Sequence, residues 1–170
     1  ISTFHSLGAR MLREHGAHFG RSKYFSIYDE DDQVVVLRQA AEAQGLSFKV
    51  PQLKRILRGF ARAKNAGQQS QDAVLPSEFI QIEVEGLGRE YESRLARADA
   101  FDFGDLILRP AQLLEEDQRL AFRYRSLWRW VLVDEFQDTN AAQYKWLKQL
   151  APPGSNLFVV GDDDQSIYGW

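Results

Sequence analysis

Two adjacent carboxylates, Asp134 and Glu135, follow directly on an apolar run at residues 130–133. A run without a polar break predicts a strand that is buried on both faces of a parallel sheet. In open α/β sheets the ligand crevice lies beyond the carboxyl ends of the strands, so a nucleotide would bind beside these acids. One carboxylate can hold Mg²⁺ there, and the other can orient or deprotonate an attacking water. Solvated acids that merely follow a strand are the alternative.

A second apolar run, residues 156–160, also leads into acids, the first of which is Asp162. Gln165 and two aromatic residues, Tyr168 and Trp170, follow within the same short segment. A neutral amide can hydrogen-bond a γ-phosphate without the repulsion that an acid would suffer, and aromatic rings can stack on bases. The alternative is that both aromatic residues belong to the core under the sheet.

The segments VDEFQDTN (133–140) and VGDDDQSIYGW (160–170) resemble motifs II and III of superfamily 1 DNA helicases of the UvrD, Rep and PcrA type. The resemblance implies an enzyme that hydrolyses ATP with Mg²⁺, moves 3′ to 5′ on single-stranded DNA and unwinds duplex DNA in repair or replication. The roles that it implies for single residues are Mg²⁺ binding by Asp134, water positioning by Glu135, γ-phosphate sensing by Gln165, nucleotide coupling by Gln137 and Asp162, and base stacking by Tyr168 and Trp170.

Two further segments are similar to DNA-contacting parts of the same family. The sequence Thr3-Phe4-His5-Ser6 resembles motif Ib, and Thr3, His5 and Ser6 can each donate a hydrogen bond to a phosphate oxygen. Residues 102–106 resemble a DFDDL segment in which Phe103 would stack on a base, although glycine replaces the usual acid at position 104. Helix capping by Thr3 and by Asp102 is the alternative.

The elements around these residues predict an α/β protein with three parts. The resemblance implies a partial RecA-like parallel sheet with flanking helices, of the P-loop NTPase type, and an inserted all-helical subdomain. Residues 1–27 and 101–170 would form the motor domain, and residues 28–100 would form the insertion, called 1B in the family. Helical spacing of apolar residues independently predicts that residues 28–100 are almost entirely helical.

Local signals place the helices more closely. Asp29 is expected to cap a helix, Pro51 to open another that ends at residues 65–67, and Pro76 to open a long helix that reaches Leu95. Asn140 and Gln143 are spaced as a capping pair for a helix over residues 139–150. Five basic residues could face duplex DNA or form a solvated helix face: Lys54, Arg55, Arg58, Arg62 and Lys64.

Composition sets broad limits on the function. The 170 residues carry 21 basic and 24 acidic side chains, and the net charge of −3 neither supports nor excludes a nucleic-acid partner. The chain has no cysteine, which excludes disulfides and thiolate metal sites within it. No apolar run is long enough to span a bilayer and no signal peptide is recognisable, so a cytoplasmic protein without a membrane partner is expected.

The 170 residues contain no G-x-x-x-x-G-K-[ST] phosphate loop, which is the principal anchor of ATP in such motors. We therefore expect a fragment that lacks ATPase activity alone and needs the remainder of the helicase chain, with repair or replication proteins as possible further partners. Two alternatives stay open, namely a helicase subunit of a helicase-nuclease of the RecB or AddA kind and a DNA-binding relic without hydrolysis. A relic would be expected to have lost Glu135 or Gln165, since folding needs neither.

Overall fold

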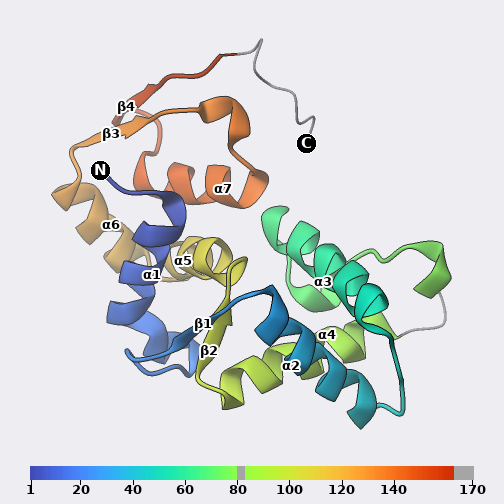
Figure 1. The fold of residues 1–170 in the computed structure, drawn as a ribbon. Helices are drawn as coiled ribbons and strands as arrows, with labels where there is room; N and C mark the ends of the chain where they lie inside the picture. Colours follow the sequence, from blue (N-terminus) through green and yellow to red (C-terminus); the bar gives the residue numbers. More distant parts are fainter. Residues whose placement is uncertain (80–82, 163–170) are drawn as a thin grey trace.

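The computed structural model describes residues 1–79 and 83–162, which form two small parallel sheets among helices (Figure 1). In the first sheet β1 (Ser26–Tyr28) pairs with β2 (Ala100–Asp102). In the second sheet β3 (Trp130–Val133) pairs with β4 (Asn156–Val159) in parallel. The expectation that the two apolar runs form adjacent parallel strands is confirmed, and the chain is of the α/β class.

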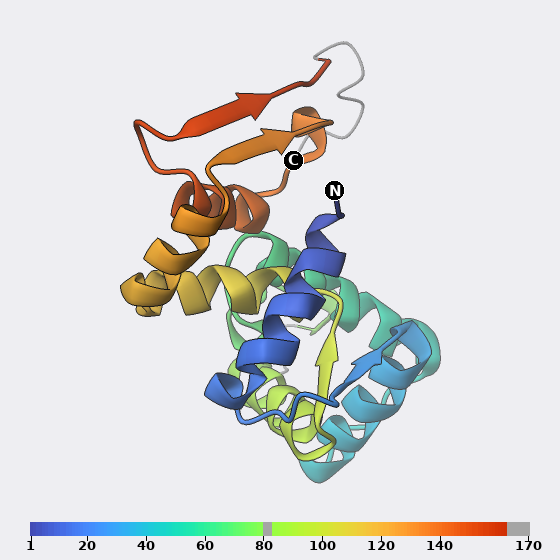
Figure 2. The same ribbon diagram turned by 90° about the vertical axis from the view of Figure 1, so that its left-hand side faces the viewer.

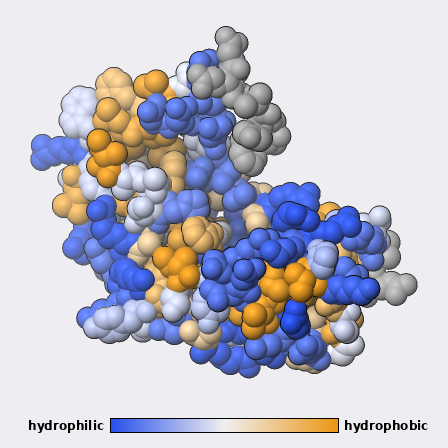
Figure 3. All heavy atoms as spheres, in the orientation of Figure 1, coloured by the Kyte–Doolittle hydropathy of each residue, from blue (hydrophilic) through white to orange (hydrophobic). Residues whose placement is uncertain are grey.

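The expectation that these strands are buried on both faces is wrong. Val133 is the one buried residue of β3, Leu132 is 76% exposed, and all of β4 is exposed. Figure 3 shows apolar side chains gathered over this strand pair, and the rings of Trp130 and Phe158 stack with centroids 5.9 Å apart. Among the described residues this sheet has two strands, and no second layer covers its outer face (Figure 2). An apolar run makes a strand suitable for burial, but burial needs that second layer.

The chain between β1 and β2 is helical in its described part, as the apolar spacing predicts. Three α-helices and two short 3₁₀ turns follow one another there: α2 (Glu30–Ala43), α3 (Val50–Asn65), η2 (Ser70–Asp72), η3 (Ser77–Phe79) and α4 (Val84–Arg97). The predicted signals occur at their ends. The Asp29 carboxylate accepts hydrogen bonds from the N–H groups of Asp31 and Asp32, and Pro51 lies in the first turn of α3. Gly67, at φ 80°, follows the end of α3.

The prediction that one long helix begins at Pro76 is wrong. Phe79 belongs to the short turn η3, and α4 begins only at Val84. From that turn Phe79 packs against Phe48, with ring centroids 6.1 Å apart, so the apolar stripe that suggests one helix is shared by two segments. Gly88 lies in α4 where a Cβ atom would come within 2.5 Å of the backbone of Gln71, which lets η2 pack directly on α4.

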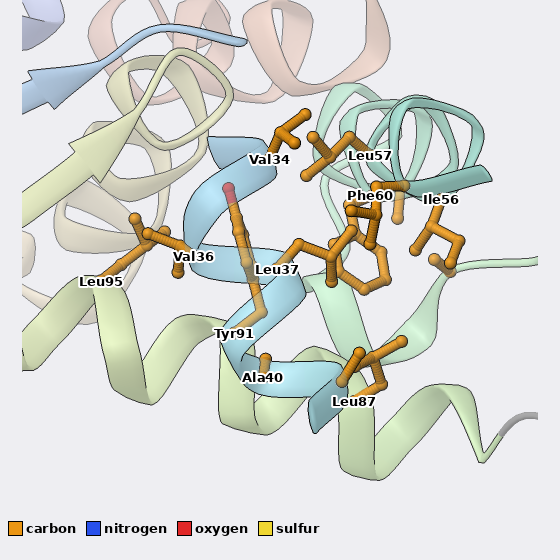
Figure 4. Close-up of a cluster of buried hydrophobic side chains, with 14 of the residues drawn as sticks. Val34, Val36, Leu37, Ala40, Ile56, Leu57, Phe60, Leu87, Tyr91 and Leu95 are labelled. Atoms are coloured by element: carbon orange, nitrogen blue, oxygen red, sulfur yellow. The ribbon is translucent and has the colours of Figure 1, made fainter. Parts of the chain in front are cut away.

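The three helices surround a hydrophobic core of their own (Figure 4). Leu37 from α2, Phe60 from α3 and Leu87 from α4 meet there, and each is almost fully buried. Tyr91 lies between α2 and α4, with its hydroxyl directed away from α4. This hydroxyl reaches the edge of the core, where charged residues begin.

The remaining helices hold the two sheets together. They are α1 (Phe4–His15), the 3₁₀ turn η1 (Gly16–Phe19), α5 (Asp105–Glu116), α6 (Gln118–Leu127), the 3₁₀ turn η4 (Phe136–Asp138) and α7 (Ala141–Leu150). Helices α1 and α7 both pack on α5. At Gly8 of α1 an added Cβ atom would lie 1.8 Å from the carbonyl oxygen of Leu106, so α1 and α5 cross in direct backbone contact. Trp146 of α7 is fully buried beside Phe4.

None of the helices among the described residues is both long and apolar enough to cross a membrane.

Two neighbouring valines of α2 test the position of the helical core. Val36 is 7% exposed and Val35 is 52% exposed. Val36→Ala should lower the free energy of unfolding by about 1.5–3 kcal/mol, because two buried methyl groups are lost and a cavity remains. Val35→Ala is the matched control and should change it by less than about 0.5 kcal/mol. Urea unfolding of both variants and the parent chain measures the difference, and equal losses would contradict the assigned core.

Candidate functional site

Asp134 and Glu135 lie where the sequence places them, at the carboxyl end of β3. Both side chains are exposed, and the Asp134 carboxylate accepts a hydrogen bond from the Glu135 N–H at 3.0 Å. Glu135 has φ 54° and ψ 42°, a left-handed backbone conformation that residues other than glycine rarely adopt. This sharp turn leads into η4, so both carboxylates lie at the strand end, immediately before the 3₁₀ turn.

Gln137 joins this turn to the segment that follows β4. Its side-chain N–H donates to the Glu135 carboxylate at 2.6 Å, and its amide oxygen accepts from the backbone N–H of Asp162 at 3.0 Å. The Phe136 N–H also donates to the carbonyl of Val160 at 3.0 Å. A Cβ atom on Gly161 would lie 2.7 Å from the Gln137 amide oxygen, so the close approach depends on glycine there. The structure thus brings together Glu135, Gln137 and Asp162.

The other predicted members of this second segment, Gln165, Tyr168 and Trp170, lie outside the described residues.

Thr3 caps α1, as its residue type allows. Its hydroxyl oxygen accepts the Ser6 N–H at 3.2 Å, and the hydroxyl donates to the Ser6 side chain at 2.9 Å. Thr3, His5 and Ser6 are all exposed. Partial burial of the imidazole lowers the pKa of His5 below its ordinary value. A ring N–H is available to donate in either charge state.

Phe103 lies beside His5, although nearly a hundred residues separate them in sequence. The two ring centroids are 5.8 Å apart in an edge-on arrangement, and Phe103 is 51% exposed. It occupies the turn between β2 and α5. The structure therefore gathers Thr3, His5, Ser6 and Phe103 on one exposed surface, which the sequence predicts only as two separate segments.

A hollow of about 550 Å³ lies between the start of α1 and the end of β3. Thr3 and His5 line it from the start of α1, Asp134 lines it from the end of β3, and Gln143 and Leu147 line it from α7. Asp134 and the pair Thr3 and His5 thus line the same hollow.

A buried charge cluster, which the sequence does not reveal, lies behind Phe103. The Lys64 side chain is 1% exposed, and its ammonium lies 2.7 Å from Asp102, 2.8 Å from Glu92 and 2.9 Å from Asp105. Arg109 binds the same Glu92 and Asp105 at 2.8 and 3.0 Å. The one available signal is that Lys64 follows Phe60 by four residues and so lies on the apolar face of α3. Both interpretations of Lys64, as a DNA-facing residue and as part of a solvated helix face, are wrong.

Charge pairing also changes the interpretation of the other basic residues of α3. Lys54 binds Glu30 at 3.1 Å, and Arg55 binds Glu78 at 2.9 Å. Among the described residues, Arg58 and Arg62 have no ion pair. Much of the positive charge on this helix is therefore already neutralised locally.

The charged groups in the buried cluster change one another's pKa values. Burial lowers the pKa of the Lys64 ammonium, but Asp102, Asp105 and Glu92 outweigh that effect and raise it above the ordinary value. Burial raises the pKa of Asp105, but Lys64 and Arg109 more than offset this and lower it. Burial and the neighbouring charge of Asp105 raise the pKa of Asp102. Lys64 is thus a fixed positive charge at neutral pH.

The candidate positions for a metal ion differ in what they offer. Carboxylate oxygens of Glu92, Asp102 and Asp105 lie close enough together to hold a cation, but the Lys64 ammonium already lies between them. Asp134 instead offers an exposed carboxylate at a strand end. A hard cation such as Mg²⁺ commonly binds through one or two carboxylates and keeps several waters, which suits Asp134.

Comparison with known proteins places the whole chain. The family model of the UvrD/REP helicase N-terminal domain matches residues 1–170. DNA helicase II of Haemophilus influenzae is 35% identical over 170 residues, which are 100% of this chain and 23% of that protein. ATP-dependent DNA helicase PcrA of Staphylococcus epidermidis is 35% identical over 171 residues, and ATP-dependent DNA helicase Rep of Escherichia coli is 36% identical over 174 residues. Both matches cover 100% of this chain, and they cover 24% and 25% of the relatives. The chain spans about a quarter of the length of these curated relatives. It belongs to the UvrD/REP helicase family, and the part of the family that it matches is the N-terminal domain.

Proposed function

We propose that this chain is part of an ATP-dependent DNA helicase that couples Mg-ATP hydrolysis to 3′-to-5′ movement on single-stranded DNA and to duplex unwinding. The observation that carries the proposal is the pair Asp134 and Glu135 at the end of β3, hydrogen-bonded through Gln137 to the segment after β4. The names of the relatives, ATP-dependent DNA helicases PcrA and Rep, support it. The chain contains no phosphate loop, so we expect no ATPase activity from it alone.

In the intact enzyme Asp134 and Glu135 would have separate roles in ATP hydrolysis. Asp134 would hold Mg²⁺, which neutralises charge on the phosphates when it is bound. Glu135 would orient the attacking water and accept its proton. The Gln137 amide donates to the Glu135 carboxylate and would fix its direction. Gln165 would sense the γ-phosphate, a role that rests on the resemblance.

We propose a link between the nucleotide and the DNA that begins at the Gln137 amide. Gln137 binds both Glu135 and the backbone of Asp162, so a movement of either turn would be passed to the other. Asp162 leads along the chain towards Tyr168 and Trp170, which the proposal assigns to DNA bases.

The proposed domain organisation follows the strands. Residues 1–27 and 101–170 would belong to the RecA-like motor domain, and residues 28–100 would form the inserted helical subdomain. In support, β1 ends at Tyr28 and β2 begins at Ala100, and the helices between them share one core. The order β3, α7, β4 with parallel strands is that of a βαβ unit.

The proposed surface for single-stranded DNA combines the start of α1 with the turn after β2. Thr3, His5 and Ser6 would donate to phosphate oxygens, and the exposed ring of Phe103 would stack on a base. The edge-on contact of His5 with Phe103 places a backbone-binding group next to a base-binding group. Other parts of the helicase chain, and repair or replication proteins, would complete the assembly on duplex DNA.

The variant Glu135→Gln tests the proposed chemistry in the full-length protein. It keeps the size of the side chain and removes the base, so ATP binding should persist while DNA-stimulated turnover falls by about two orders of magnitude or more. Glu115→Gln, at an exposed acid near the end of α5, is the control and should turn over normally. Steady-state ATPase rates together with nucleotide binding decide the matter. Near-normal turnover in Glu135→Gln would place the base elsewhere.

The variant Thr3→Asp separates helix capping from phosphate binding. Aspartate is a good N-cap, so the melting temperature should stay close to that of the parent protein. Its negative charge near a phosphate should weaken single-stranded DNA binding by roughly 1 kcal/mol or more. Thr3→Ser keeps both the cap and the hydroxyl and should bind normally. Titration of a labelled oligothymidylate compares the three proteins, and unchanged affinity in Thr3→Asp would limit Thr3 to capping.

A further inference from the structure

The turn that carries Phe103 is held by a residue from a distant helix. Within the turn, the Asp105 N–H donates to the Asp102 carboxylate at 2.9 Å, and the Asp102 N–H donates to the Asp105 carboxylate at 3.3 Å. These reciprocal bonds close a loop over Phe103 and Gly104. The Lys64 ammonium then binds both carboxylates, at 2.7 and 2.9 Å, from the last turn of α3.

Each carboxylate of the turn is restrained from a further side. The Tyr91 hydroxyl of α4 donates to Asp102 at 3.0 Å, and Arg109 of α5 donates to Asp105 at 3.0 Å. Asp102 and Asp105 are both buried, whereas Phe103 between them is half exposed. Two buried carboxylates, each with several hydrogen-bond partners, thus flank one exposed aromatic ring.

Gly104 explains how Lys64 can come so close. A Cβ atom at position 104 would lie 2.7 Å from Cδ and 3.0 Å from Cβ of Lys64. The lysine could not easily move aside, because three carboxylates hold its ammonium. Position 104 is where the resemblance calls for an acid, and in this structure the Lys64 side chain fills that space.

We infer that Lys64 is a positioning residue for Phe103, and that its ammonium, bound to both carboxylates of the turn, holds the Phe103 ring beside His5 for stacking on single-stranded DNA. The inference rests on the proposed function, because it takes Phe103 to be a base-stacking residue. It adds a role for the helical segment between β1 and β2, which reaches the DNA surface through Lys64 without touching DNA. An exposed ring has few packing partners, so the backbone turn beneath it must set its direction.

A double-mutant cycle in the full-length helicase tests this role. Phe103→Ala should weaken binding of a labelled oligothymidylate about fivefold or more, the range expected for loss of one stacked base. Gly104→Ala pushes on Lys64 without removing charge, and Lys64→Met removes the charge at similar length. Both should weaken binding in the parent protein by a similar factor and have no further effect when Phe103 is already alanine. A contribution to stability alone would not depend on residue 103.

Matched controls exist on α3 and on α4. Lys54→Met changes another lysine of α3, whose ion pairs lie at the surface, and Gly86→Ala adds a methyl group to α4 opposite the flexible side chain of Glu83. Both should leave DNA binding unchanged. Thermal melting of every variant shows that the proteins compared are folded.

The possible outcomes separate the two claims. If Phe103→Ala binds DNA normally, the proposed DNA role of Phe103 fails, and the inference about Lys64 fails with it. If Phe103→Ala weakens binding but Gly104→Ala and Lys64→Met do not, or weaken it equally in both backgrounds, only the positioning role is overturned. Failure of both Gly104→Ala and Lys64→Met to fold would also overturn it, since the cluster would then serve stability.

Discussion

The ammonium of Lys64 among three carboxylates is the interaction on which the arrangement of the chain depends. It joins α3, through Lys64, to α4 through Glu92 and to β2 and α5 through Asp102 and Asp105. Burying an ion costs several kcal/mol unless its partners are placed well, and a carboxylate left without its cation would be strongly destabilising. The cluster therefore tolerates one geometry, and that geometry fixes how the helical core meets the first sheet.

A second constraint acts at the strand ends of the other sheet. Residues on the exposed strands β3 and β4 contribute little packing, so hydrogen bonds must keep the acidic turn in place. The Val160 N–H donates to the carbonyl of Val133 at 2.8 Å, and the Phe136 N–H donates back to the carbonyl of Val160. These bonds continue the ladder past the last paired residues and hold Glu135 in its left-handed conformation. The position of the acid thus depends on the neighbouring strand as well as on its own.

Sequence predicts those features that local chemistry decides. Asp29 and Asn140 cap helices because a short acceptor side chain can satisfy the free N–H groups next to it, and Pro51 begins a helix because its φ suits the first turn. The parallel pairing of β3 with β4 also follows from two apolar runs separated by a helix. The capping and first-turn inferences need only neighbouring residues, and the strand pairing needs only the order of the segments along the chain. The structure confirms each of them.

Features that depend on distant contacts are not predictable in this way. The exposure of Leu132 is decided by whether another layer covers the sheet. Phe79 packs against Phe48 from a short turn outside α4, although its spacing in the sequence suits the same helix. A lysine at helical spacing with apolar residues looks like a solvated charge until its partners are known, and those of Lys64 lie about 30 to 40 residues away. The contact between His5 and Phe103 cannot be predicted from sequence either, because it follows from the crossing of α1 with α5.

The two turns that carry the candidate site are held in place in the same way. Phe103 and Glu135 are both exposed, and a side chain that must reach a ligand cannot be held by a core of its own. In each case backbone and side-chain hydrogen bonds from a remote segment hold the turn: the Lys64 ammonium for one, the Asp162 amide and the Val160 carbonyl for the other. Because these bonds are directional, a small shift in the remote segment would move the exposed group. Such an arrangement would suit the proposed helicase function, in which the same side chains must be held firmly and yet respond to a distant change.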